Sequence, residues 1–387
     1  MLRLHRRILL ATLSALVGCT GLRADYADLI TFFETLAGSG NAAVFPVGPG
    51  SLDDVESAFG PREQSSTGNY DWHRGIDIDG EDMVDAVVAP LDGYFYDYRT
   101  TTSGGNIVIL EHRFTDFGTP SITYAGQTLT KFYTWHLHLW DDEVAANGTS
   151  TDDLVSGYTA GDAISRGTPI GVLSNSGSSG GSPYAPHLHF ELRVGTNSSL
   201  EYQLNNDTTQ WGFDPHMNPM LLFGDPGNLT QSLSLASGGP GSTDLVFDYS
   251  VSNDDYPLLN SMTAQIRNAS TLAEIDSHTL EYNQRTGFDA ASTALLDTQD
   301  TTLPYVEPSS SPFSSSDWET QFVVPDSWLE GNIDQGYELL LTATDIWGNS
   351  TTTTLALTAV PEPRTTVLLL GLSTLLVIGH RRISPKA

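Results

Sequence analysis

Residues able to hold a metal ion gather in the stretch Ala185 to Leu192, which reads APHLHFEL. If this run is a β-strand, successive side chains point to opposite faces. His187, His189 and Glu191 then share one face, while the apolar residues between them face a core. Neutral imidazole is the commonest metal-ligand side chain, so the two histidines can serve one site as ligand and as acid or base. Taken alone, a chance pair on a solvated face explains the pattern equally well.

His73 and Asp77 form a second candidate pair, separated by three residues within the run YDWHRGIDI. Gly75 and the β-branched Ile76 favour a strand or a turn here over a helix. An imidazole and a carboxylate are both good zinc ligands. In isolation, an exposed histidine and aspartate beside a turn are the simpler interpretation.

Two further histidines, His136 and His138, lie in the run FYTWHLHL over residues 132–139. Alternation along a strand puts both on one face, with Trp135 and Leu137 on the other. The apolar face predicts a core, so we expect both histidines to face one groove. Periodicity therefore does not choose between them.

Strands and tight turns surround these motifs and must position them. Apolar runs bounded by glycine and proline predict strands in residues 87–96, 106–112 and 161–173. A loop rich in serine and glycine, residues 174–181, leads into the histidine-rich strand. Its GSSGG segment matches the G-x-S-x-G nucleophile elbow, which a helix must follow. Pro183 and Pro186 follow instead, so a flexible loop is the better interpretation.

Composition indicates a turn-rich β protein. The chain has 387 residues, enough for two or three domains, with 36 glycines and 20 prolines. The formal net charge of -30 argues against a nucleic-acid partner, whose phosphates attract lysine and arginine. An acidic, solubilising surface is typical of an exported protein that tolerates salt.

The order of these motifs resembles the lysostaphin/LytM-like zinc metallopeptidases. The resemblance covers residues 45–224 and lies in the succession F-G-x-R, H-x-x-x-D, A-P-x-x-G, a central His-Leu, G-D-x-x-x-x-G-x-x-I-G, P-H-L-H-F-E and Asn218-Pro219. It implies a mainly β fold, with an antiparallel β-sheet metallopeptidase domain of the duplicated hybrid motif type in residues 45–225. It also implies an endopeptidase acting on the cross-links or stem peptides of bacterial peptidoglycan.

The resemblance also implies roles for individual residues. His73, Asp77 and His189 match the ligands of one zinc ion per chain, and His187 matches a catalytic histidine. Three protein ligands leave a fourth position for water or substrate, as in catalytic zinc sites. The family has a second catalytic histidine, followed by leucine and then a small or polar residue.

We predict that this second catalytic histidine is His136, because Leu137 and His138 follow it, whereas the bulky Trp140 would occupy the third place after His138. His138 would then contact the catalytic groups or the substrate. The chain departs from the family pattern in an acidic insertion, residues 141–158, and in extra Ser and Gly residues before His187. Both segments are expected to line the substrate groove.

Residues 1–24 resemble a signal peptide, with three arginines before an apolar run. The segment LVGC also resembles a bacterial lipobox at Cys19, the only cysteine, and an ordinary signal cut near Ala24 is the alternative. The mature chain would then have no disulfide. Residues 25–44 predict a short helix and a linker, since apolar residues recur at helical spacing up to Leu36.

The C-terminal part differs in composition. Short alternating strands in residues 226–358 predict a small immunoglobulin-like β-sandwich, either a spacer or a glycan-binding module. Residues 359–387 combine a VPEPR motif, an apolar stretch and basic residues, and resemble a PEP-CTERM sorting signal. That resemblance implies a partner, the membrane sorting protease of a Gram-negative cell. A plain C-terminal anchor is the alternative.

The sequence as a whole predicts an exported zinc endopeptidase of the cell envelope, in the periplasm, outer membrane or cell surface, anchored in the membrane before processing. The alternative is a catalytically silent zinc-binding protein that regulates a partner or binds the cell wall. The sequence leaves open which peptide bond is cut and whether the tail is removed.

Overall fold

A computed structural model describes most of the chain between residues 28 and 358. The parts outside the description are 1–27, 49, 51–53, 58, 65–68, 125, 141–156, 180–181, 196–214, 225–229, 240–242, 253–258, 282–306, 309–317, 325, 330–331 and 359–387. The expected signal peptide, lipobox and sorting signal therefore lie outside the described residues. Among the helices described, none has the length and apolar character needed to cross a membrane.

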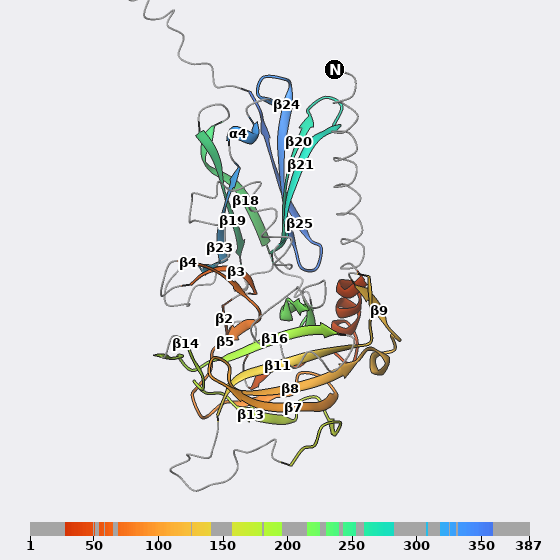
Figure 1. The fold of residues 1–387 in the computed structure, drawn as a ribbon. Coiled ribbons are helices and arrows are strands. Elements are labelled where there is room, and N and C mark those ends of the chain that lie inside the picture. The colour runs from red at the N-terminus through yellow and green to blue at the C-terminus, as the bar shows by residue number, and fades with distance from the viewer. Residues whose placement is uncertain are drawn as a thin grey trace, which may run out of the picture.

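The described fold is mainly β and its strands pair antiparallel, as the sequence predicts. The largest sheet has eight strands in the order β12-β7-β8-β11-β16-β5-β2, with β17 also paired to β16 (Figure 1). These strands are β2 (Val55–Ser57), β5 (Ile76–Ile78), β7 (Gly93–Thr101), β8 (Gly105–Arg113), β11 (Lys131–Leu139), β12 (Ala163–Ile164), β16 (Leu188–Gly195) and β17 (His216–Met217).

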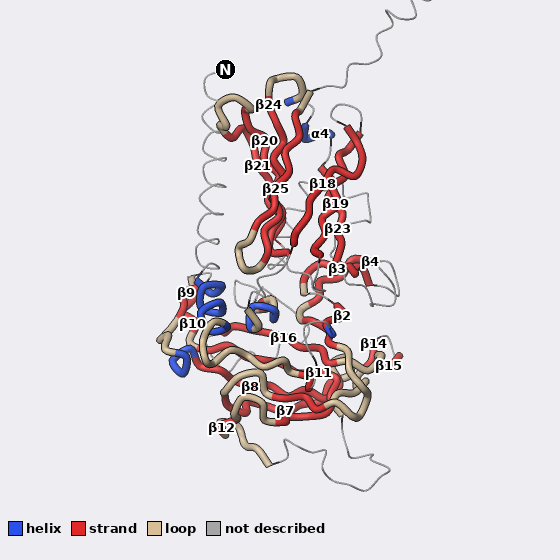
Figure 2. The backbone as a smooth tube through the Cα atoms, turned by 180° about the vertical axis from the view of Figure 1, so that it is seen from behind, coloured by secondary structure: helices blue, strands red, loops and turns tan. Residues whose placement is uncertain are grey.

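One face of this sheet builds the main core. The apolar side chains of β16 at alternate positions, Leu188, Phe190 and Leu192, are fully buried there, which confirms the expected alternation. A helix over residues 28–37, predicted from the sequence at 25–36, packs onto this core at one end of the sheet (Figure 2). Phe33 of the helix meets Phe132 of β11 edge-on, with ring centroids 5.4 Å apart.

The other face of the sheet carries a second, smaller cluster of buried side chains. Its members are Ile107, Ile109, Tyr133, Trp135 and Leu137. Because β-strand side chains alternate, the odd-numbered residues of β11 up to Leu137 and of β16 share this face. This second face therefore carries His187, His189 and Glu191.

Short strands form smaller sheets in the same part of the chain. β1 (Val47–Gly48), β6 (Ala86–Val88) and β13 (Pro169–Val172) form a three-stranded sheet. Three hairpins complete this part: β3 (Gly60–Gln64) with β4 (Asn69–His73), β9 (Ile122–Tyr124) with β10 (Gln127–Leu129), and β14 (Ser178–Ser179) with β15 (Ser182–Pro183).

The C-terminal part forms two four-stranded antiparallel sheets, ordered β18-β19-β23-β22 and β21-β20-β24-β25. The strands are β18 (Thr230–Gly239), β19 (Thr243–Ser252), β20 (Leu259–Asn268), β21 (Glu274–Glu281), β22 (Glu307–Pro308), β23 (Trp318–Val324), β24 (Tyr337–Asp345) and β25 (Ser350–Ala356), with a short helix α4 (Asp326–Leu329).

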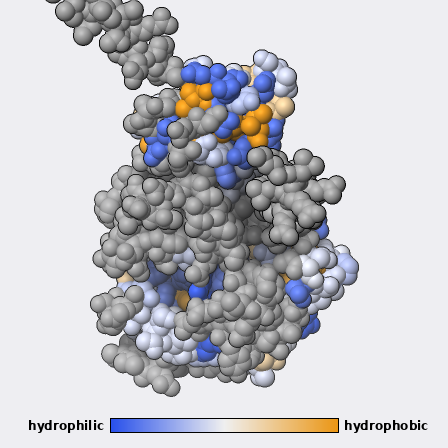
Figure 3. All heavy atoms as spheres, turned by 45° about the horizontal axis from the view of Figure 1, so that its top comes forward, coloured by the Kyte–Doolittle hydropathy of each residue, from blue (hydrophilic) through white to orange (hydrophobic). Residues whose placement is uncertain are grey.

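Gln231 of the first sheet donates to the buried Asp345 of the second at 3.1 Å, so the two sheets are linked as well as packed. Apolar side chains (orange) are exposed among polar ones on this two-sheet unit in Figure 3. The pair of sheets agrees with the expected β-rich unit, and its immunoglobulin-like class stays a prediction.

Candidate metal centre

Two strand pairings bring the predicted ligands together. β5 pairs antiparallel with β16, and Asp77 lies directly opposite His189 in that register. β4 ends at His73, and the chain then turns through residues 74–75 to enter β5. The turn returns the His73 side chain to Asp77, so a sequence separation of four residues becomes a contact.

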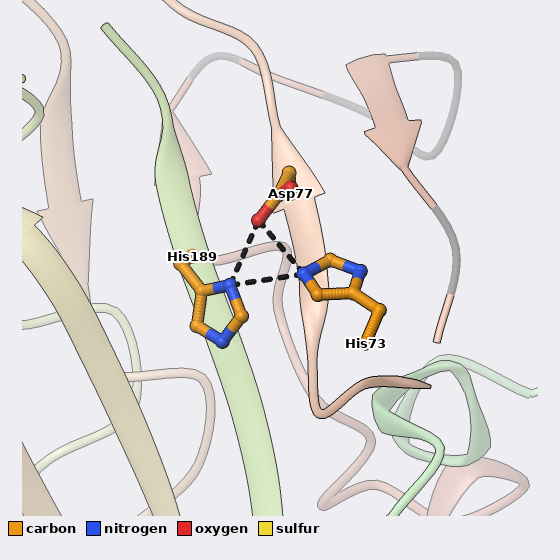
Figure 4. Close-up of side chains that lie close together, drawn as sticks. All are labelled: His73, Asp77 and His189. Carbon is orange, nitrogen blue, oxygen red and sulfur yellow. Dashed lines mark hydrogen bonds and ion pairs between the residues drawn. The ribbon is translucent and has the colours of Figure 1, made fainter. Parts of the chain in front are cut away.

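Three donor atoms converge where these elements meet (Figure 4). His73 Nε2 lies 3.1 Å from Asp77 Oδ1 and 3.1 Å from His189 Nδ1, and His189 Nδ1 lies 2.8 Å from Asp77 Oδ1. The side chain of His73 is buried and those of Asp77 and His189 are about 15% exposed. The three predicted ligands therefore form one compact, mostly buried group.

The donor set of this group fits zinc. Two imidazole nitrogens and one carboxylate oxygen are ordinary zinc ligands, and Zn–N or Zn–O distances near 2.0–2.1 Å place tetrahedral ligands about 3.3 Å apart. The sides of the observed triangle, 2.8 to 3.1 Å, are close to that value. His73 also turns its other nitrogen, Nδ1, toward Ser57 Oγ at 3.4 Å, which leaves Nε2 for the group.

The electrostatics of the group favour a cation. Burial alone would raise the pKa of Asp77, but His73 and His189 outweigh this and hold its pKa well below the usual range. Burial would lower the pKa of His189, yet hydrogen bonds to Asp77 and Glu191 outweigh it and raise that pKa to about 9. A metal ion at His189 Nδ1 would have to displace a proton, so its affinity should rise with pH up to that pKa.

Gly75 allows the turn between the first two ligands to pass directly over β16. A Cβ at this position would lie 2.4 Å from the Phe190 carbonyl oxygen and 2.9 Å from His189 Nε2. No side chain fits there without moving the strand that carries a ligand. The glycine between His73 and Asp77 is therefore a packing requirement of the site.

Replacing Gly75 by alanine should destabilise the protein by about 1–3 kcal/mol and weaken metal binding, because the new methyl group overpacks against β16. Gly40→Ala is the matched control, since a Cβ at Gly40 meets no atom within 4 Å. Denaturant unfolding and a metal titration measure both variants. Equal stability and equal metal affinity of the two variants would contradict the packing argument.

His187 lies beside the triangle. Its Nε2 is on the side of the triangle and can accept a proton. Its Nδ1 is 2.7 Å from the Ala185 carbonyl oxygen, and since a carbonyl only accepts, Nδ1 carries the hydrogen. Its Nε2 is 3.6 Å from Asp77 Oδ1, too far for a hydrogen bond but within the same site. His187 thus lies next to the three predicted ligands and outside the triangle, and its catalytic role stays a prediction.

The structure brings His138 to the site, beside His187. The ring of His138 lies 4.7 Å from that of His187 and 6.0 Å from that of His189, measured between centroids. Its Nδ1 donates to the Ser176 carbonyl oxygen at 2.8 Å, so the neutral ring presents Nε2 as a proton acceptor. Tyr184 packs against it with ring centroids 4.5 Å apart.

A β-bulge in β11 explains this placement. Between the pairs His136–Val108 and Leu139–Asn106, β11 has two residues and β8 has one. The extra residue, His138, has φ 64, in the left-handed region that non-glycine residues rarely adopt. Its N–H donates to the Gly104 carbonyl instead of to the ladder. The bulge turns the His138 side chain to the face that carries the site.

The structure does not bring the predicted catalytic residue, His136, to the metal group. His136 is fully buried on the core face, where its ring packs 5.3 Å from that of Phe190 and its Nδ1 lies 3.3 Å from the Val108 carbonyl. Strict alternation would have put both histidines on one face, and the bulge separates them. Of the two, His138 is the one that reaches the metal group.

Burial keeps His138 uncharged. Loss of solvent, followed by the neighbouring His187 and His189, lowers the pKa of His138 to about 3. The histidine is therefore neutral at physiological pH, and its Nε2 lone pair is available.

The sequence predicted no role for Tyr184 or Glu191, although the alternation placed Glu191 on the face of the ligands.

Comparisons with known proteins give a partial likeness. No family model matches the chain, and no curated protein matches it. A solved "putative peptidase M23" from Pseudomonas aeruginosa is 15% identical, with 52% of this chain and 60% of that chain covered and a TM-score of 0.24.

A solved "putative glycyl-glycine endopeptidase lytM" from Ruminococcus gnavus is 21% identical, with 49% of this chain and 62% of that chain covered and a TM-score of 0.27. The chain thus spans less than two thirds of the length of either protein. At these identities and TM-scores, the two structures say nothing about the activity of this chain. The proposed activity is therefore argued from the site.

Proposed function

We propose that this chain is a zinc-dependent endopeptidase that cleaves peptide bonds in bacterial peptidoglycan. The observation that carries the proposal is the site: a triangle of three zinc-type donors faced by two further imidazoles, His187 and His138. A purely structural zinc site is closed by four protein ligands. Among the described residues only three donors converge here, and the groups beside them are suited to proton transfer.

His73, Asp77 and His189 would hold the ion through Nε2, Oδ1 and Nδ1, the atoms that form the triangle. Zinc bound there would act as a Lewis acid toward a peptide carbonyl and ease the loss of a proton from water. The low pKa of Asp77 keeps its carboxylate charged for this task. The remaining steps fall to the side chains around the triangle.

His187 is the proposed general base. The Ala185 carbonyl holds its Nδ1–H, so Nε2 accepts the proton that a nucleophilic water gives up. His138 presents a second acceptor on the same side, held by the Ser176 carbonyl. His187 can take a proton from the attacking water and return it to the leaving amine, while the neutral His138 accepts a hydrogen bond beside it.

The peptidoglycan substrate is proposed from the motif order in the sequence, which resembles the lysostaphin/LytM-like enzymes. Of the segments expected to line the groove, the insertion 141–158 and the Ser- and Gly-rich loop before His187, residues 141–156 and 180–181 lie outside the described residues. We also propose the domain limits 45–225 and 226–358, and export to the cell envelope with a tail that a sorting protease processes. The charge and the two terminal sequence patterns support export and tail processing, and the change in composition after residue 224 supports the domain limits.

Metal analysis of the purified chain tests the proposed ligand set. One zinc per folded chain is expected, with an affinity that rises about tenfold per pH unit below the pKa of His189, since one proton is displaced. His278→Ala, in the C-terminal sheets, is the control and should keep the ion. Absence of stoichiometric zinc, or zinc that persists in His73→Ala, would overturn the proposal.

A further inference from the structure

The side chains on the metal-site face of β16 continue beyond His189, the last of the three proposed ligands. His187, His189, Glu191 and Arg193 occupy alternate positions, so all four face the same side of the sheet. The first two belong to the proposed site, and the last two have no part in the chemistry described above. Both are nevertheless almost completely buried, at 3% exposure for Glu191 and 1% for Arg193.

Glu191 contacts the back of the ligand His189. Its Oε1 lies 3.1 Å from His189 Nε2, on the side of the ring opposite the metal triangle. The other carboxyl oxygen, Oε2, is held by the Arg193 guanidinium, which is the pairing of a carboxylate. A carboxylate only accepts hydrogen bonds, so His189 Nε2 must carry the hydrogen. The lone pair that remains for a metal is then on Nδ1.

Arg193 holds the other oxygen of Glu191. Its Nε and one terminal nitrogen both contact Glu191 Oε2. The guanidinium lies over the Trp135 ring, 3.7 Å from the centroid, and Trp135 is directly opposite Glu191 in the β11–β16 register. Arg99 lies over the same indole at 5.7 Å. The carboxylate is thereby fixed between a stacked cation and the ligand.

We infer that Glu191, anchored by Arg193 on Trp135, is a positioning residue that orients His189 so that Nδ1 faces the metal group. The inference rests on the proposed zinc site and deepens it. Outer hydrogen-bond partners of metal-bound histidines set the ring orientation and basicity, and their loss typically lowers metal affinity by about 10–100-fold. A buried ion pair that merely stabilises the sheet would have no such effect on metal binding.

Strand β8, separated from β16 by β11 in the same sheet, provides a matched control for that simpler explanation. Glu111 and Arg113 of β8 have the same spacing, and Arg113 Nε donates to Glu111 Oε1 at 2.8 Å. The Arg113 guanidinium lies 3.9 Å from the Tyr94 ring centroid, and Tyr94 is directly opposite Glu111. Glu111 accepts hydrogen bonds from Arg113 and Lys131. These residues are on β8 and β11, whereas His189 is on β16.

The test compares Glu191→Gln with Glu111→Gln. Glutamine has one acceptor oxygen, so at position 191 it satisfies either His189 or Arg193 but not both. Zinc affinity, measured by competition with a chromogenic chelator, should fall about 10–100-fold in Glu191→Gln. It should change less than about twofold in Glu111→Gln. Equal affinities of the two variants would overturn the inference.

A second readout is independent of zinc and of the variants' folding. In the unsubstituted protein, the His189 Nε2 proton should be visible by ¹⁵N-edited NMR as a slowly exchanging ring signal, because Glu191 binds and buries it. A rapidly exchanging or absent Nε2 proton would overturn the inference. If the chain binds no zinc, the proposed function fails, while this signal still decides whether Glu191 orients His189.

Discussion

Alanine in place of His138 should lower kcat on a peptidoglycan peptide by about 10²–10³-fold, the usual cost of removing one positioned hydrogen-bonding group from the transition state. His138 Nε2 is a proton acceptor on the side of the site that His187 occupies. Its Nδ1 is bound to a carbonyl and takes no part in zinc ligation, so the variant should keep its zinc. Single-turnover cleavage with a metal assay measures both quantities.

His136→Ala is the control, because this histidine lies two positions before the bulge residue His138 and faces the opposite side of the sheet. Its truncation leaves a cavity in the core and should lower the unfolding free energy by about 2–5 kcal/mol. Activity per folded molecule should remain near that of the parent. A larger loss of kcat in His136→Ala than in His138→Ala would contradict the assignment.

The second large effect separates the metal ligands from the base. His187→Ala should keep zinc and lose about 10²–10⁴ in kcat, because the acceptor for the proton of water is removed. His73→Ala should lose zinc and activity together, since Nε2 of His73 is one corner of the triangle. Metal content and peptide cleavage are measured on both variants and on the parent.

A catalytically silent protein would give a different pattern. It would bind zinc and cell wall without any cleavage for His187→Ala to remove. Loss of zinc in His187→Ala would place that residue among the ligands and contradict its role as base. Retained activity in His187→Ala would also contradict the role of His187 as base.

Local sequence patterns predicted the strand that carries the site. The alternation of histidine with Leu188 and Phe190 fixes which side of β16 faces the core, because a strand has a period of two residues. Gly75 and the β-branched Ile76 between and beside His73 and Asp77 indicated a strand or a turn, and the structure has a turn at residues 74–75 followed by β5. That Asp77 would lie opposite His189 depends on register between distant strands, and the sequence indicated it only through the order of the motifs.

The bulge at His138 was beyond local patterns. Residues 132–139 alternate without a glycine or proline that would mark an irregular position, so a regular strand was the natural expectation. The pairing of β11 with β8 changes after His136, and the reason is long-range: the N–H of His138 donates to Gly104 and its ring binds Ser176. The choice between two histidines therefore required the tertiary structure.

The buried pair of Glu191 and Arg193 shows a similar limit. The sequence placed Glu191 on the face of the ligands, but its contact with the far nitrogen of His189 depends on how Arg193 stacks on a neighbouring strand. Charge patterns along one strand do not report such cross-strand stacking. The role of this pair follows from the structure alone.

The most direct measurement is mass analysis of the products formed from purified peptidoglycan by the zinc-loaded protein, with and without a strong chelator. We expect new amino and carboxyl termini within the cross-links or stem peptides, which disappear on chelation and return when zinc is restored. The same digest with His187→Ala should yield none. Cleavage that survives thorough chelation, or no cleavage by the zinc-loaded parent, would contradict the proposed function.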